Sequence, residues 1–130
     1  MRPTMWIVGT LLLFPFHGVS ALGLGELEVQ SIMNQRLDGR IDLTSVKTGD
    51  IINMTVRLAD PDVFESAGLP RPFYLTRLQF EPVETAENAG YIRITSKERI
   101  REPYLNFIIE VSWPNGKLLR EYTVLLKKPG

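Results

Sequence analysis

Alternation of apolar and polar residues runs through most of this chain, and this two-residue period is the feature that most constrains the fold. It occurs in five segments before residue 100, at 26–30, 37–43, 52–58, 78–82 and 91–95. Side chains of a strand point alternately to its two faces, so the period is typical of half-buried β-strands. These segments therefore predict strands that each bury one face.

The strongest strand signal lies near the C-terminus. Residues 104–113 place five apolar side chains on one face: Leu105, Phe107, Ile109, Val111 and Trp113. Asn115-Gly116 is typical of a tight hairpin turn, because both residues tolerate positive φ. A return strand over 118–126 follows.

Counting from a turn at Asn115-Gly116 predicts the register of this hairpin. The predicted pairs are Trp113 with Leu118, Ile109 with Tyr122, Phe107 with Val124 and Leu105 with Leu126. This register sets Glu110 against Glu121, and it places Arg120 opposite Val111 on the core side, with its stem leaving past Trp113 or over the sheet edge. A three-residue turn would pair Glu110 with Arg120 instead, but it would turn Glu121 and Thr123 inward. We prefer the first register, because a misplaced apolar face costs more than one exposed like-charge contact.

The segments between the strands carry turn and helix signals. Asp60 and Pro61 suit a helix cap and first turn, and Gly68 suits its end, so we expect a short helix over 61–67. The polar stretch 84–90 and the charged run 97–99 are predicted to be loops. Seven strands with short connections predict an all-β fold, an antiparallel immunoglobulin-like sandwich with one helical turn. A small, partly open barrel is the alternative.

The first 21 residues differ from the rest. Arg2 precedes an apolar stretch from Met5 to Phe16, and Val19-Ser20-Ala21 fits the small-x-small rule for signal peptidase. We therefore expect a cleavable signal peptide over 1–21, with cleavage after Ala21, and a single β domain over 22–130. The expected location is the periplasm, and the protein is expected to be membrane-anchored if the leader stays uncleaved.

Composition excludes much chemistry. The chain has no cysteine, and its only histidine, His17, lies in the predicted leader. Thiol and imidazole catalysis are therefore not expected in 22–130, and no cofactor or metal is predicted. Lys plus Arg and Asp plus Glu number 15 each, so there is no electrostatic case for nucleic acid.

Weaker patterns also have simple structural interpretations. Asp60 and Asp62 are interpreted as a helix cap with first-turn charge, since a calcium site needs more oxygen ligands. Glu26 and Glu28 are interpreted as solvent-facing strand residues. The aromatic residues Phe107, Trp113 and Tyr122 are expected in the core rather than in a ligand cleft.

Longer motifs carry a family resemblance. Residues 101–107, Arg-Glu-Pro-Tyr-Leu-Asn-Phe, and 113–126, which begin Trp-Pro-Asn-Gly, resemble the N-terminal domain of the FimV family, also called HubP or TspA-type proteins. Segments 22–29 and 31–37 share the likeness, which covers roughly 22–128. The resemblance implies a Gram-negative inner-membrane scaffold that acts at cell poles in type IV pilus assembly and twitching motility. It implies no catalytic residues in this domain.

The family plan also includes a LysM module, a transmembrane helix and a cytoplasmic part, none of which follows the last predicted strand here. We therefore expect a soluble periplasmic version of the first domain, either a stand-alone paralogue or a truncated gene. The main hypothesis is a non-enzymatic interaction module for an envelope protein of pilus or secretion assembly. The alternative is a peptidoglycan or glycan binder that stacks sugars on Tyr74, Tyr91 or Tyr104. No small-molecule substrate is expected.

One stretch is the candidate interaction surface. Arg99, Arg101, Glu102 and Tyr104 flank the strand with the most family-like sequence. Their alternative role is turn chemistry before Pro103, because a residue preceding proline is restricted to extended conformations.

Overall fold

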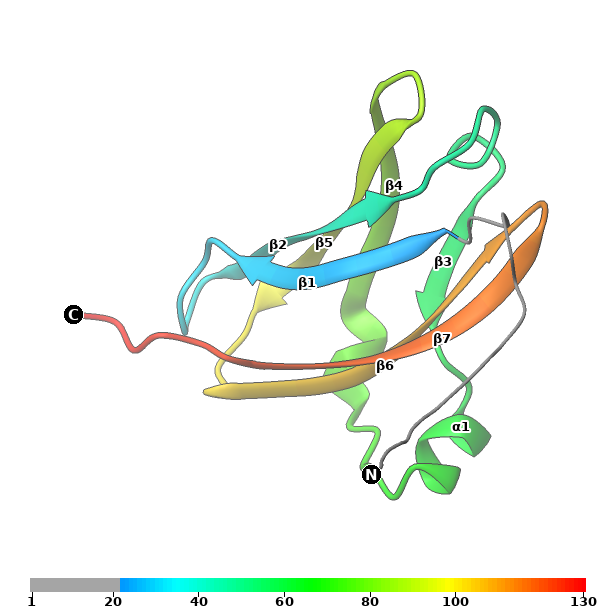
Figure 1. The fold of residues 1–130 in the computed structure, drawn as a ribbon. Helices are drawn as coiled ribbons and strands as arrows, with labels where there is room; N and C mark the ends of the chain where they lie inside the picture. Colours follow the sequence, from blue (N-terminus) through cyan, green and yellow to red (C-terminus); the bar gives the residue numbers. More distant parts are fainter. Residues whose placement is uncertain (1–21) are drawn as a thin grey trace, which may run out of the picture.

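The computed structural model describes residues 22–130, so the predicted leader lies outside the described residues. Seven strands form two antiparallel sheets (Figure 1). One sheet has the order β1-β2-β5-β4 and the other β3-β6-β7. The strands are β1 (Gly23–Val29), β2 (Arg36–Thr44), β3 (Thr55–Leu58), β4 (Leu78–Ala86), β5 (Ala89–Arg99), β6 (Tyr104–Trp113) and β7 (Gly116–Leu125). Among these residues, no helix is long and apolar enough to cross a membrane.

The two sheets face each other across one apolar core. Inward residues of β2 and β6, such as Leu37, Ile41, Phe107 and Ile109, are at most 2% exposed. The first, second, fifth and fourth strands share one sheet, and the third, sixth and seventh share the other, as in a seven-stranded immunoglobulin domain. The immunoglobulin-like sandwich predicted from alternation is therefore confirmed, and the barrel alternative is wrong.

The third strand is shorter than predicted. It begins at Thr55 rather than at residue 52, and Ile52 is 79% exposed while Ile51 and Met54 are buried. The preceding loop winds around the buried carboxylate of Asp50, which accepts a hydrogen bond from the Lys47 backbone N–H at 2.9 Å. Residues 52–54 follow the apolar–polar alternation but lie in this turn. The exposure of Ile52 shows that the alternation does not mark a strand face there.

The predicted loop over 84–90 is mostly strand. β4 continues to Ala86 and β5 starts at Ala89, so only Glu87 and Asn88 form the turn, with Asn88 at φ 63°. Pro82 lies inside β4, which is an edge strand of its sheet. Its missing N–H therefore need not interrupt a pairing ladder.

The hairpin of β6 and β7 has neither of the predicted registers. Trp113 pairs with Gly116, Val111 with Leu118 and Phe107 with Tyr122, so Pro114 and Asn115 form the turn. The register is shifted by two residues, which keeps the same face buried. Gly116 lies against the indole, since a Cβ there would meet Trp113 Cζ2 at 3.0 Å. Neither Asn115 nor Gly116 has the positive φ from which a turn at these two residues was predicted.

Other consequences follow from this register. Glu110 lies opposite Leu119 rather than Glu121, and Arg120 lies opposite Ile109. The Arg120 side chain leaves over the sheet edge, one of the two predicted routes, and its Nη1 donates to Leu24 O of β1 at 2.9 Å. Tyr122 Oη likewise donates to Gly25 O at 2.8 Å. These two bonds join the sheets along the β1–β7 side.

The helix α1 (Pro61–Ser66) agrees with the prediction to within one residue. Gly68 has φ +73°, as expected for the residue that ends a helix. Asp60 occupies the N-cap position, but its side chain makes no capping hydrogen bond. Its carboxylate is instead bound by Arg57, so the predicted capping role of this side chain is wrong. A 3-10 helix, η1 (Phe73–Arg77), then leads into β4.

Candidate interaction surface

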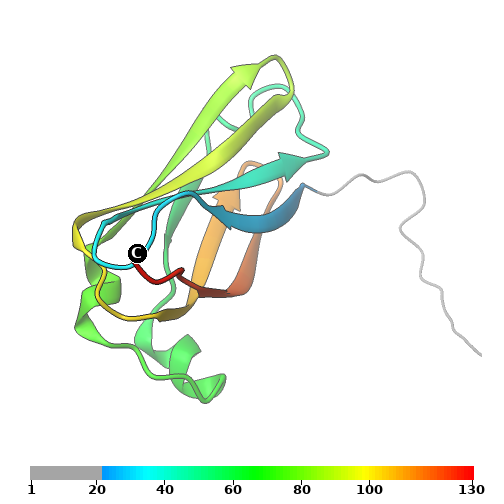
Figure 2. The same ribbon diagram turned by 90° about the vertical axis from the view of Figure 1, so that its left-hand side faces the viewer.

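A hollow of about 530 Å³ lies where β2 begins and β5 ends, and two residues of the predicted surface line it. Arg99 and Arg101 share this hollow with Arg36, Lys97 and Glu98. Figure 2 looks onto this end of the sandwich, where the β1–β2 connection, the end of β5 and the C-terminal segment lie together. Met33 N–H donates to Lys127 O at 2.9 Å, which holds the last of these segments in place.

The other two predicted residues are not part of the hollow. Glu102 lies in the connection after β5, and Tyr104 begins β6. Tyr104 pairs with Leu125 on the neighbouring strand, and the two side chains are 52% and 74% exposed. Of the four predicted residues, only Arg99 and Arg101 therefore line the hollow, and Tyr104 forms an exposed pair with Leu125.

A bulge in β5 positions the charged side chains. Asp38 pairs with Thr95 and Arg36 with Arg99, so the strand carries extra residues between these pairs. The buried hydroxyl of Ser96 fills the gap: it accepts from Leu37 N–H at 2.8 Å and donates to Glu98 O at 2.6 Å. Residues 97–99 thus belong to β5 rather than to the predicted loop, because Ser96 replaces the interrupted ladder bonds.

Backbone carbonyls orient two of the arginines. Arg36 Nε donates to Lys97 O at 3.0 Å, and Arg99 Nη1 donates to Asn34 O at 3.2 Å. Asn34 is itself held by the bond from its N–H to Ile100 O at 2.8 Å. A guanidinium carries five N–H donors, so each arginine keeps most of its donors for other partners.

The charges of the hollow are unbalanced. It has four cations and one carboxylate, Glu98, which lies 3.6 Å from Arg77. Within residues 22–130, none of the four cations forms an ion pair. The hollow can therefore attract anionic groups from outside the chain.

Arg36 and Lys97 were missed by the sequence analysis. Arg36 is 61 residues from Lys97, and only the β2–β5 register brings the two together. Lys97 stood in a run interpreted as a solvated loop. A cation directly before a predicted strand was the only available signal, and it did not distinguish Arg36 from other surface arginines.

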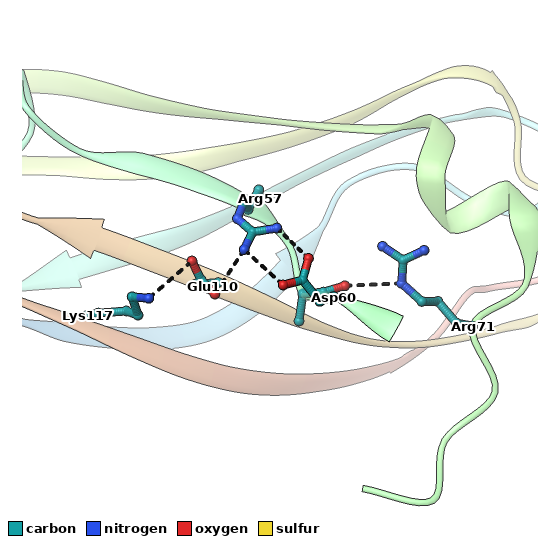
Figure 3. Close-up of polar contacts among 6 residues, drawn as sticks. Arg57, Asp60, Arg71, Glu110 and Lys117 are labelled. Carbon is teal, nitrogen blue, oxygen red and sulfur yellow. Dashed lines mark hydrogen bonds and ion pairs between the residues drawn. The ribbon is translucent and has the colours of Figure 1, made fainter. Parts of the chain in front are cut away.

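A second charged cluster lies on the outer face of the other sheet, near the start of α1 (Figure 3). Arg57 Nη1 lies 2.9 Å from Asp60 Oδ1, and Arg57 Nη2 lies 3.2 Å from Glu110 Oε1. Lys117 Nζ approaches Glu110 Oε2 at 3.8 Å, and Arg71 Nε donates to Ala59 O at 3.1 Å. This cluster connects β3, β6, β7 and the segment around α1.

Mutual neutralisation shifts the pKa values in the second cluster. The hydrogen bond and charge of Arg57 lower the pKa of the Asp60 carboxyl, and Asp60 in turn raises the pKa of Arg57. Each group stabilises the charged form of the other. The role of Asp60 is therefore to join a strand to the helix start. The described residues contain no group of three His, Cys, Asp or Glu side chains arranged to hold a metal ion.

Two of the three tyrosines considered for sugar stacking are partly covered. Arg40 lies over the Tyr91 ring, with Cζ 3.9 Å from the ring centroid, and Tyr74 is half-buried. Only Tyr104 is exposed as expected. Of the aromatic residues predicted in the core, Phe107 and Tyr122 are buried and Trp113 is half-buried.

Comparisons with known proteins agree with the family resemblance. The family model described as the FimV N-terminal domain, an Ig-like domain, matches residues 22–129. The curated "Motility hub protein FimV" of two Pseudomonas aeruginosa strains, PAO1 and UCBPP-PA14, is 49% identical over 116 residues, 87% of this chain. The chain spans 12% of the length of these relatives. No solved structure gave a significant match. The chain therefore belongs to the family of FimV N-terminal, Ig-like domains.

Proposed function

We propose that this chain is a non-enzymatic protein-interaction module that acts in the periplasm as part of a FimV-type motility or pilus-assembly scaffold. The observation that carries the proposal is the hollow around Arg99 and Arg101, which four cations and one carboxylate line. Such a surface attracts a partner without performing chemistry on it. The 49% identity to proteins named as motility hubs supports the assignment to a scaffold.

The arrangement of polar groups is consistent with binding rather than catalysis. The aromatic side chains of Phe107 and Tyr122 pack into the core, and Glu110 is held by Arg57 and Lys117. The sandwich instead offers charged strand ends and open sheet edges. Surfaces of this kind bind other proteins through main-chain hydrogen bonds and charge pairs.

Crosslinking in the cell tests the proposal. The chain would be expressed in its own host with a periplasmic affinity tag, crosslinked and purified, and the captured proteins identified by mass spectrometry. We expect enrichment of pilus-assembly or other inner-membrane envelope proteins over an untagged control. Recovery of cell-wall fragments alone would favour the glycan-binding alternative, and recovery of nothing above the control would contradict both.

A further inference from the structure

The hollow at the end of β5 combines excess positive charge with a preformed shape. We propose that it binds an acidic segment of a partner protein, with carboxylates seated against Arg36, Arg99 and Arg101. This inference rests on the proposed function and names the chemistry of the partner. It differs from the sequence prediction because it requires Arg36 and Lys97, which only the register places there.

The donors of the hollow suit carboxylates. Arg36 and Arg99 each use one N–H on a backbone carbonyl, at 3.0 and 3.2 Å, and this contact limits rotation of the guanidinium. A planar guanidinium binds a carboxylate through two parallel hydrogen bonds. Because the side chains are already oriented, binding orders fewer groups than at a surface of free lysines.

The charge distribution favours a short acidic segment over a broad anionic surface. The whole chain carries equal numbers of positive and negative residues, 15 of each, so it has no extended positive field. Membranes and nucleic acids attract proteins through such a field. A local recess of about 530 Å³ lined by four cations matches a few neighbouring carboxylates instead.

The frame of the hollow is well connected. Asn34 N–H donates to Ile100 O at 2.8 Å, and Ile100 N–H donates to Gln35 O at 2.9 Å, so the β1–β2 loop is bonded to the residue after β5. Ile100 is itself buried at 4% exposure. Arg101 follows directly from this anchored position. We therefore expect the recess to keep its shape when Lys97 or Arg101 is substituted.

A fluorescently labelled oligo-glutamate peptide titrated with the purified chain tests this inference by anisotropy. We expect Arg101→Glu to weaken binding by about tenfold, since it removes one charge-assisted contact and adds repulsion. Lys97→Glu should also weaken binding of the peptide. Arg101 and Lys97 side chains make no hydrogen bond or ion pair within residues 22–130, so thermal unfolding should show both variants folded. Binding should weaken as salt rises, because the cations are exposed.

Lys47→Glu is the matched control, because it makes the same charge change at an exposed lysine in the β2–β3 loop, at the opposite end of the sandwich. It should leave the affinity for the peptide nearly unchanged. An equal loss of peptide affinity in Lys47→Glu and Arg101→Glu would overturn the inference, and so would an unchanged peptide affinity in Arg101→Glu. Stronger binding to phosphatidylglycerol vesicles or inorganic phosphate than to the peptide would also overturn it.

The same variant separates this inference from the proposed function. If the wild-type chain captures an identified envelope protein and Arg101→Glu captures it equally, the module stands and the hollow is not its acidic-segment site. Loss of that protein in Arg101→Glu, but not in Lys47→Glu, supports both. If the wild type captures no protein in the cell, the proposed function fails, and peptide binding still decides the chemistry of the hollow.

Discussion

The two charged clusters of this domain differ in what their cations contact. In the cluster of Figure 3, Arg57 and Lys117 face the carboxylates of Asp60 and Glu110, and the Glu110 side chain is only 13% exposed. In the hollow, Arg36 and Arg99 donate to backbone carbonyls, and all the lining side chains are exposed. The first cluster neutralises its charges internally, whereas the second leaves them available.

The difference separates a structural role from a binding role. Ion pairs within a chain join the elements that carry them, here β3, β6, β7 and the start of α1. Cations that bond only to neutral carbonyls keep their full charge and their attraction for external anions. If this comparison is correct, substitutions in the two clusters will affect stability and binding in different proportions.

Ser96→Ala should have the largest effect, because it breaks the frame beneath the hollow. The change leaves Leu37 N–H without its acceptor and Glu98 O without its donor, in a site where Ser96 is 6% exposed. An unsatisfied buried group costs about 1–3 kcal/mol. Urea unfolding should show this loss, and oligo-glutamate binding should weaken as the bulge relaxes. Unchanged stability would mean that water replaces the hydroxyl.

Tyr122→Phe provides a reference for a buried polar bond away from both clusters. It removes the bond from Tyr122 Oη to Gly25 O, and we expect a loss of about 1 kcal/mol. Oligo-glutamate binding should stay the same, because this bond lies at the β1–β7 side. If Tyr122→Phe also weakened oligo-glutamate binding, the bond between the sheets would affect the shape of the hollow.

Tyr122 also predicts an alkaline transition. Burial raises the pKa of Tyr122 to about 12, from a usual value of 10.0. Between these values the unfolded chain releases the phenolic proton and the folded chain keeps it, so stability falls as pH rises. Unfolding curves measured across this pH range should show the fall in the wild type, and Tyr122→Phe should reduce it.

Asp60→Asn should produce a smaller change confined to the balanced cluster. The Arg57 hydrogen bond lowers the pKa of Asp60 below its usual 3.8, so its contribution is fully present above that value and is lost as pH falls through the lower, folded pKa. The wild type should therefore be more stable than Asp60→Asn near neutral pH, and this difference in stability should disappear in acid. Because Asp60 is exposed, the effect should also shrink in high salt. Equal acid sensitivity of both proteins would contradict the prediction.

Arg101→Ala should have the smallest effect on stability, within about 0.5 kcal/mol, because the exposed side chain makes no hydrogen bond or ion pair in residues 22–130. Its effect should appear in oligo-glutamate affinity instead. A large loss of stability would place Arg101 with the structural cluster and remove the distinction between the two regions.

Local pattern predicted much of the fold. The alternation of apolar residues identified the seven strands and the inward faces of β2 and β6, and the Asp60, Pro61 and Gly68 signals located α1. Strand ends were less accurate: residues 84–86 and 97–99 looked like loops because they are polar. Backbone pairing, rather than side-chain polarity, determines where a strand ends.

The candidate site was predicted only in part. Arg99 and Arg101 were identified through their place before a family-like strand, but Glu102 and Tyr104 lie outside the hollow. The hairpin register was wrong by two residues because it was counted from a turn at Asn115-Gly116. The turn is formed by Pro114 and Asn115, and neither Asn115 nor Gly116 has the positive φ on which the count relied.

The number of strands, their buried faces and the family could therefore be predicted from local sequence, because they depend on residues that lie close together in the chain. Which charges form ion pairs within residues 22–130, and which do not, depends on how the strands pair. Arg36 joins Lys97 across 61 residues, and Arg57 joins Glu110 across 53, through strand pairings that no local pattern encodes. The interaction of two charges depends on the distance between them in space, and the pairing of strands in the two sheets determines that distance.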